Sequence, residues 1–166
     1  MNLPYAEPLT RRAPAALTIP EPPRRGEAGG EPCFPCNPGT AESAIRADER
    51  WTLHNPGQTG LVGAVWLASR VHFDSYGDMP AEEAATLGAV AGRVERAILA
   101  LGGVGRVHVY RWGEGGAHFH LWFVPRPLGR MDMAGPFLPV WEDVLEPADP
   151  ADIEAAGQKI AAAMDA

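Results

Sequence analysis

The sequence predicts an α+β domain in which about five antiparallel strands form a sheet and one long helix packs on it. Two observations favour this fold class. Apolar residues recur at helical spacing through residues 78–101. Short strand-like segments lie on both sides of that helix, at 43–55, 60–69 and 104–124. A second helix is expected at the C-terminal end, over residues 149–166.

The bulk composition fits one globular domain. The chain has 166 residues, of which 46% are hydrophobic, and a formal net charge of -7. That acidic balance argues against a nucleic-acid binder, which needs a basic face, but it leaves room for a nucleotide-sized ligand. The sequence has no apolar run of about 18 residues and no secretory leader, so we expect a cytoplasmic protein without a membrane span.

The first 32 residues differ in composition from the remainder. They are rich in Pro, Arg, Glu and Gly, as in PEPPRRGEAGGEP at 20–32. Such a stretch is typical of a disordered or loosely draped tail. We therefore divide the chain into a tail at 1–32, a domain at 33–148 and the C-terminal helix at 149–166. The pair Arg24–Arg25 within the tail gives only a weak basic spot.

The segments before the long helix are predicted as turns and strands. EPCFPCNPG at 31–39 has prolines and a glycine around both cysteines and is predicted to be a series of turns. Residues 43–55 form two short strands joined by a turn at Asp48–Glu49. The apolar segment 60–69 suits a buried strand, and we assign Trp51 and Trp66 to the core.

The long helix carries clear start and stop signals. Asp78 is a plausible N-cap, Pro80 sits in the first turn, and Glu82 and Glu83 complement the helix dipole. The glycine pair 102–103 ends the helix. The apolar positions at helical spacing are Leu87, Val90, Val94, Ile98 and Leu101.

A hairpin follows the long helix. Residues 104–112 and 117–124 are predicted strands, and GEGG at 113–116 is the loop between them. GPFLPVWEDVL at 135–145 is compatible with a short helical turn. Asp149 and Pro150 then provide a cap and a first position for the C-terminal helix.

Two histidines share one face of the second hairpin strand. Alternate side chains of a strand point the same way, so His118, His120 and Trp122 face one side and Phe119 and Leu121 the other. Strand rise places the two imidazoles roughly 6.5–7 Å apart. That separation suits two adjacent but separate tasks better than joint binding of one metal. The alternative is a pair of half-buried histidines with satisfied hydrogen bonds.

The pair Cys33–Cys36 can occupy two corners of a zinc tetrahedron. A redox pair or two buried thiols would explain it equally well. A thioredoxin-like site would require the pair to open a helix, and none is predicted after Cys36. The remaining zinc ligands would be histidines, but spacing alone does not choose among them. The candidates are His54 in a turn, His72 after the apolar strand, His108 within a strand, and His118.

The order of these motifs resembles the histidine-triad superfamily. CxxC, a strand ending in SRVH, a long helix, a strand, a glycine-rich loop and HxHxxxxPR span residues 33–127. The pattern is most similar to the branch that includes galactose-1-phosphate uridylyltransferase and carries zinc. The resemblance implies one structural zinc per chain, held by Cys33, Cys36, His72 and His118. It also implies that the middle position of the triad, His120, is the nucleophile.

The implied activity is hydrolysis or nucleotidyl transfer at the α-phosphate of a nucleotide or nucleotide conjugate, through a covalent nucleotidyl-histidine. Loop amides could form a nest for the phosphate, with Glu114 protonating a leaving group. The predicted substrate-binding residues are Arg111, Gly113, Gly115, Gly116, Trp122 and Arg126. Family members commonly form homodimers, which the resemblance implies here.

Two departures from the family pattern leave other functions open. Trp122 replaces the third histidine, and Glu114 stands where relatives carry Gln. A non-catalytic nucleotide-binding or scaffold protein that retains zinc is therefore the first alternative. A CxxC redox protein is the second.

Overall fold

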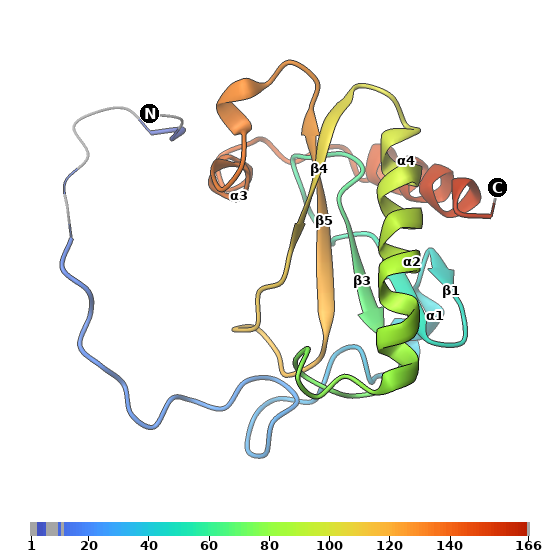
Figure 1. Cartoon of the computed structure of the whole chain (residues 1–166). Coiled ribbons are helices and arrows are strands. Elements are labelled where there is room, and N and C mark those ends of the chain that lie inside the picture. The colour runs from blue at the N-terminus through green and yellow to red at the C-terminus, as the bar shows by residue number, and fades with distance from the viewer. Residues whose placement is uncertain (1–2, 6–9, 11, 166) are drawn as a thin grey trace.

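The computed structural model describes residues 3–5, 10 and 12–165, and it has the predicted α+β architecture (Figure 1). Five antiparallel strands form one sheet in the order β1-β2-β3-β5-β4. The strands are β1 (Arg46–Ala47), β2 (Trp51–His54), β3 (Val65–Ser69), β4 (Val104–Tyr110) and β5 (His120–Pro127). The two short strands at 43–55 and the hairpin after the long helix are therefore confirmed.

The helices lie around this sheet. They are α1 (Pro38–Glu42), α2 (Ala81–Leu99), the 3-10 turn η1 (Met131–Met133), α3 (Phe137–Glu142) and α4 (Pro150–Ala163). The predicted start of α4 is confirmed, because the Asp149 side chain accepts a hydrogen bond from the Ala151 amide. Within the described part of the chain, no helix has the length and apolarity that crossing a bilayer would require.

The long helix α2 begins later than predicted. Pro80 has an extended backbone and occupies the N-cap position, so the first helical residue is Ala81. Asp78 is not the cap, because its carboxylate accepts hydrogen bonds from the hydroxyl and amide of Ser75. At the other end, Gly102 and Gly103 both have positive φ, which glycine adopts without strain and which turns the chain toward β4.

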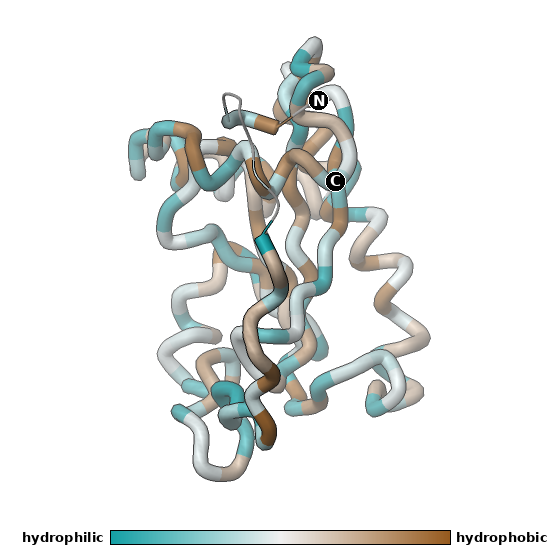
Figure 2. Tube along the Cα trace, turned by 90° about the vertical axis from the view of Figure 1, so that its left-hand side faces the viewer, coloured by the Kyte–Doolittle hydropathy of each residue, from teal (hydrophilic) through white to brown (hydrophobic). Residues whose placement is uncertain are grey.

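Apolar side chains at alternate positions of the strands form the main core. One face of the sheet packs against α2 and α4, which contact each other there. Leu121 and Phe123 of β5 point to this face, as the alternating pattern predicts. Figure 2 shows hydrophobic and hydrophilic stretches alternating along the trace. The buried side chains that the two helices contribute include Val90, Val94, Ala97, Ile98 and Ile160.

Two strands start later than their apolar runs suggest. Residues 60–64 form a turn instead of the first half of β3, and Gly63 in it has φ +91°. The turn is held by the Ala64 amide, which donates to the Leu61 carbonyl. β5 starts at His120, so His118 lies just before the strand rather than within it. Apolar composition alone does not distinguish a buried turn from a buried strand.

The opposite face of the sheet carries a row of aromatic side chains. His54, Trp66, Trp122 and Tyr110 are successive register partners across β2, β3, β5 and β4. His54 is therefore a buried strand residue rather than a turn residue, and its ring stacks on Trp66 with centroids 4.1 Å apart. Directly opposite residues on neighbouring strands share a face, so the register itself creates this row.

Acidification from about pH 6.5 to pH 4 is expected to destabilise the fold through His54. Burial lowers the pKa of this imidazole to about 4, whereas in the unfolded chain it titrates near 6.5. Between these values the unfolded state binds more protons, so the free energy of unfolding falls as the pH falls, by at most about 3 kcal/mol. The change His54→Phe keeps a ring beside Trp66 and should flatten this dependence. Urea unfolding at several pH values measures it, and an unchanged slope would exclude His54 as the cause.

Candidate metal centre and active site

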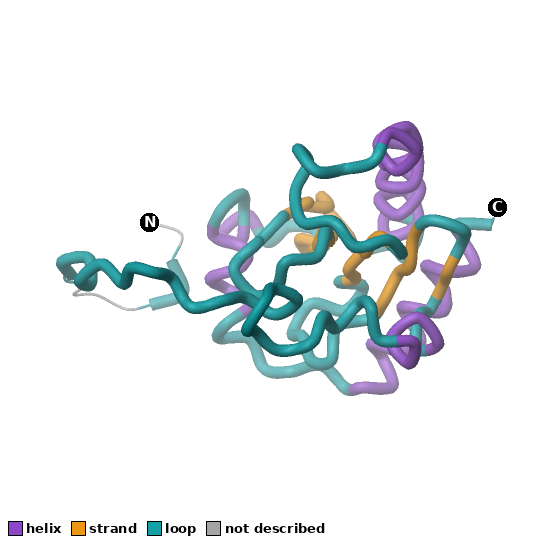
Figure 3. The backbone as a smooth tube through the Cα atoms, turned by 90° about the horizontal axis from the view of Figure 1, so that it is seen from below, coloured by secondary structure: helices purple, strands orange, loops and turns teal. Residues whose placement is uncertain are grey.

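Loops gather at one end of the sheet (Figure 3). Four side chains that can ligate a metal come together in these loops. Cys33 and Cys36 precede α1, His72 follows β3, and His118 precedes β5. One ligand atom from each lies within 4.8 Å of all the others. The sequence could not choose among five histidines, and the remaining candidate ligands His54 and His108 lie in β2 and β4, outside this cluster.

The distances in this cluster fit a tetrahedral zinc. Sγ of Cys33 and Nδ1 of His118 are 3.2 Å apart, and Sγ of Cys36 and Nδ1 of His72 are 3.3 Å apart. The two Nδ1 atoms are separated by 3.3 Å. Ordinary zinc–sulfur and zinc–nitrogen bonds place neighbouring corners of a tetrahedron about 3.3–3.8 Å apart. The Cys2His2 donor set and its spacing therefore support one zinc per chain.

Hydrogen bonding orients His118 for metal binding. Its Nε2 lies 2.8 Å from the Ser69 carbonyl oxygen, which can only accept, so the ring proton is on Nε2. The lone pair is then on Nδ1, the atom that faces the cysteines. Burial lowers the pKa of His118, which keeps the imidazole neutral. A backbone carbonyl that fixes the tautomer of a ligating histidine is common around protein metal sites.

The surroundings of the cysteine pair favour a metal site over a redox centre. A short helix does begin after the pair, contrary to prediction, because the Asn37 side chain accepts a hydrogen bond from the Gly39 amide and Pro38 takes the first position. However, burial raises the pKa of the Cys36 thiol to about 11. A reactive CxxC cysteine requires a lowered pKa. A zinc ligand is also a thiolate, so the thiol pKa does not decide between the two uses. What favours a metal is that one ligand nitrogen each from His72 and His118 lies within 4.8 Å of both sulfurs.

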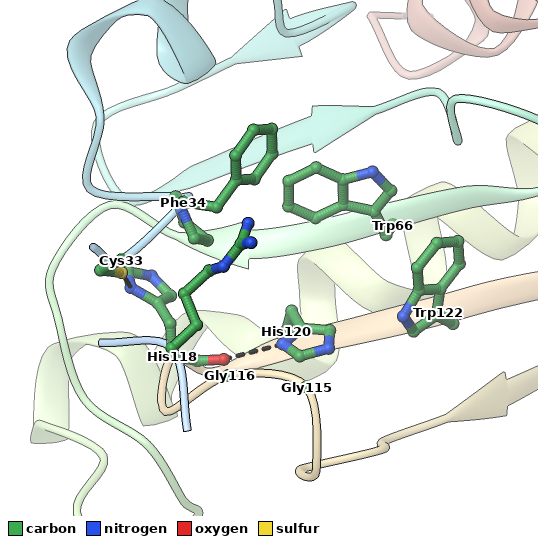
Figure 4. Close-up of a pocket in the computed structure, with 10 residues that line it drawn as sticks. Cys33, Phe34, Trp66, Gly115, Gly116, His118, His120 and Trp122 are labelled. Atoms are coloured by element: carbon green, nitrogen blue, oxygen red, sulfur yellow. Dashed lines mark hydrogen bonds between the residues drawn. The ribbon is translucent and has the colours of Figure 1, made fainter. Parts of the chain in front are cut away.

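His120 lies next to the metal cluster with one nitrogen free. Its Nδ1 is 2.7 Å from the His118 carbonyl oxygen, so Nδ1 donates and Nε2 carries the lone pair (Figure 4). The ring is half-buried and lines a cavity of about 350 Å³. The same residue thus serves two purposes, because the His118 imidazole faces the cysteines while its backbone carbonyl orients His120.

Aromatic rings form much of the cavity wall. Phe34, Trp66 and Trp122 surround the space above His120 in Figure 4. The centroids of Phe34 and Trp66 are 6.1 Å apart, and those of Trp66 and Trp122 are 6.4 Å apart. Trp66 was predicted to be a core residue, but it is only half-buried and faces this cavity. A tryptophan within an apolar run gives no sequence signal for such a position.

The last part of the predicted tail contacts the site. Arg24 donates hydrogen bonds to the carboxylates of Glu27 and Asp74 and to the Gly113 carbonyl. This pairing with Arg24 lowers the pKa of Asp74. The next residue, Arg25, forms a bridge with Gly116 and lines the cavity. The tail composition concealed the contacts with Asp74, Gly113 and Gly116, because these partners are at least 50 residues away. The proposed boundary at residue 32 stays a prediction.

The other predicted substrate-binding residues are not all at the cavity. Gly115, Gly116 and Trp122 line it, whereas Gly113 contributes its carbonyl to Arg24. Glu114 is exposed and is not part of the lining.

The two predicted arginines also lie outside the cavity lining. Arg111 donates to the carbonyl and carboxylate of Asp74, and its guanidinium lies 5.6 Å from the centroid of the Phe119 ring. Arg126 is buried near the far end of β5, where it donates to the carbonyls of Pro127 and Arg130. Both arginines were assigned to the substrate because they are close to the histidine motif in sequence, and that closeness does not indicate which groups they contact in the fold.

Solved structures with a similar fold are histidine-triad proteins. A zinc-bound histidine triad family protein from Mycobacterium smegmatis is 24% identical, with a TM-score of 0.54 over 76% of this chain and 87% of the other. A hypothetical histidine triad nucleotide-binding protein from Sulfolobus tokodaii is 17% identical, with a TM-score of 0.61 over 80% and 92%. A Hit-like protein from Bartonella henselae, solved with an unknown ligand, is 13% identical, with a TM-score of 0.54 over 73% and 85%.

No protein-family model matches the sequence, and no curated protein matches it. At these identities the likeness defines the fold alone. The chain has the histidine-triad fold, as the motif order implies. A relation to the galactose-1-phosphate uridylyltransferase branch stays a prediction.

Proposed function

We propose that this protein is a nucleotide hydrolase or nucleotidyltransferase that forms a covalent nucleotidyl intermediate on His120. The observation that carries the proposal is the hydrogen bond from His120 Nδ1 to the His118 carbonyl, which leaves Nε2 as a free lone pair at an open cavity. A neutral imidazole with one nitrogen fixed and the other unprotonated is a competent nucleophile toward phosphorus. The nucleotide-binding description of one structural neighbour agrees with this choice of substrate class.

The proposed reaction has two displacements. His120 Nε2 attacks the α-phosphorus, an N–P bond forms, and the bond from phosphorus to the leaving group breaks with its electron pair on that group. Water or another acceptor then attacks the same phosphorus and releases His120. Glu114 remains the candidate acid for the leaving group, although from its exposed position it would have to act through solvent.

The residues around the cavity suit a nucleotide. The amides of Gly115 and Gly116 and the Arg25 guanidinium supply donors for phosphate oxygens that gain charge during the displacement. Phe34 is 49% exposed, and with Trp66 it offers ring faces on which a nucleobase can stack. We assign the phosphate to the glycine side of the cavity and the base to the aromatic side.

The metal would have a structural role. All four corners of the proposed site are protein ligands, which is typical of closed structural zinc sites rather than catalytic ones. When bound, zinc would cross-link the N-terminal loop to the segments after β3 and before β5. The His118 ring would then be fixed by the zinc at Nδ1 and by the Ser69 carbonyl at Nε2. The backbone carbonyl of His118 would keep the His120 ring in one orientation.

Replacing Arg25 with alanine is expected to lower kcat/KM by roughly tenfold to a hundredfold, the range for one lost hydrogen bond to a charged group. The backbone of this segment would stay in place, because Arg24 retains its ion pairs with Glu27 and Asp74. Arg106→Ala is a matched control, since Arg106 is an exposed arginine of β4 outside the cavity lining. Equal kinetics in both variants would remove Arg25 from the proposed phosphate site.

A non-catalytic nucleotide-binding protein is the second candidate function. Trp122 favours it, since an indole with a single donor replaces an imidazole beside the nucleophile. Incubation with a nucleoside phosphoramidate and a dinucleoside polyphosphate, followed by mass spectrometry, separates the two candidates. An adduct on His120 supports the enzyme, whereas a bound nucleotide without adduct or product supports the binding protein.

Metal content tests the remaining redox candidate. About one zinc per chain under reducing conditions would exclude it, and a metal-free protein with reversible Cys33–Cys36 bonding would support it.

The homodimer and the cytoplasmic location are retained as proposals. β4 is the last strand in the sheet order and Val109 in it is 48% exposed, so this edge is the natural place for a second copy to pair. Sedimentation analysis tests the dimer.

A further inference from the structure

A second cavity adjoins the one beside His120. Its volume is about 450 Å³, and it lies between the sheet and α3. Trp122 contributes to the walls of both cavities, so the residue in the third position of the triad is also the partition between them. This space is of the size that a small organic molecule occupies.

Two tryptophans form the apolar part of the second cavity. The ring centroids of Trp112 and Trp122 are 6.3 Å apart, with an angle of 48° between the planes. Trp112 also stacks on Tyr110, with centroids 4.8 Å apart and nearly parallel planes. The orientation of Trp112 is thus supported, yet 41% of its surface remains exposed. An indole held in this way can offer its π-face to a ligand.

The polar part of this cavity is acidic. Glu142 and Asp143, at the end of α3, both line it, and among its described lining residues there is no Lys or Arg. The Glu142 carboxylate is oriented, because it accepts a hydrogen bond from the hydroxyl of buried Thr59. That hydroxyl in turn accepts from the Leu61 amide. The first cavity has the opposite character, because its lining contains Arg25 and, among its described residues, no Asp or Glu.

We propose that the second cavity binds an organic cation, namely a primary ammonium or guanidinium group on an aromatic or alkyl body. Indole faces attract a cation through the ring quadrupole, and two carboxylates accept its N–H donors. A neutral ligand would gain only the apolar contacts, and an anion would meet two like charges. This binding does not require chemistry at His120, so it is independent of the proposed phosphoryl transfer.

Calorimetric titration with three probes of one shape tests this proposal. The probes are 2-phenylethylamine, 2-phenylethanol and 3-phenylpropanoate, which differ in charge but share a phenyl ring and a short chain. We expect the ammonium to bind at least about tenfold more tightly than the other two, the range of one charge-assisted hydrogen bond. Equal affinities for all three, or no binding of the ammonium at millimolar concentration, would overturn the proposal.

Three variants locate the site. Asp143→Asn and Glu142→Gln should each weaken ammonium binding roughly tenfold or more, whereas Glu146→Gln, an exposed acid of the same segment outside the cavity lining, should not change it. Glu142→Gln loses the contact with Thr59 and could disturb α3 for that reason. Asp143 is exposed, so Asp143→Asn keeps the test valid even in that case. Unchanged affinity in Asp143→Asn and Glu142→Gln would overturn the assignment. Retained binding in His120→Ala separates this site from the proposed chemistry.

Discussion

Replacing His120 with alanine is expected to abolish turnover while zinc content and melting temperature stay close to those of the wild type. Removal of an attacking nucleophile typically lowers kcat by at least about a thousandfold. The side chain is half-buried at an open cavity, and its hydrogen bond is to a backbone carbonyl rather than to a core group. The substitution should therefore slow the chemical step without lowering the stability of the fold.

Steady-state kinetics, elemental analysis and thermal unfolding measure the three parts of this expectation, namely turnover, zinc content and melting temperature. His108→Ala is the matched control, because His108 is a histidine of the neighbouring strand β4 that does not line the cavity. Its turnover should be near that of the wild type. If His120→Ala loses its zinc, the division of roles between His118 and His120 is wrong. If it keeps full activity, the covalent intermediate on His120 is wrong.

Removing one zinc ligand is expected to have the largest effect on stability. Cys36→Ser keeps the size of the side chain but replaces a thiolate with a hydroxyl, which is a poor zinc ligand. A metal present at a thousand times its dissociation constant stabilises the fold by about 4 kcal/mol. For a chain of this length, that corresponds to a fall of roughly 8–16 °C in melting temperature. The variant should also purify without metal.

Calorimetry and elemental analysis check this result, and titration with a strong chelator gives the same test on the wild-type chain. Ser43→Ala serves as a control nearby, because the Ser43 hydroxyl donates to the Thr40 carbonyl of the preceding helix α1, and Ser43 does not belong to the metal cluster of the described residues. A metal-free Cys36→Ser protein that melts at the wild-type temperature would contradict a structural role. Activity should fall together with the metal, since the loops that hold His118 lose their cross-link.

Local sequence patterns predicted most of the fold for identifiable physical reasons. Alternation along residues 119–124 placed Leu121 and Phe123 in the core and Trp122 on the opposite face, because pleating fixes the side of each residue. The helix start was predicted less well. Asp78 has the right residue type for a cap, but its carboxylate bonds to Ser75 instead, a choice that depends on local loop geometry.

The candidate site was predictable where a motif carries the chemistry and not where contacts are long-range. The four predicted metal ligands follow from the family resemblance that the motif order carries, and the structure brings their side chains together. Arg25 and Trp66 were missed, because one lies in a segment of disordered composition and the other in an apolar run. Arg111 was expected at the phosphate but is engaged by Asp74. Partners distant in the chain decide such cases, and a single sequence does not display them.

The arrangement of the N-terminal segment has a practical consequence for how this chain can be shortened. Gly26 lies so close to Cys33 and His72 that a Cβ at this position would touch both, and Arg25 just before it lines the cavity. A truncation that begins at Cys33 would retain all five strands and every zinc ligand, yet it would discard the guanidinium proposed to hold the phosphate. The limits of a truncation are best drawn from backbone contacts rather than from composition. The predicted domain and the segment that reaches the cavity therefore start at different residues.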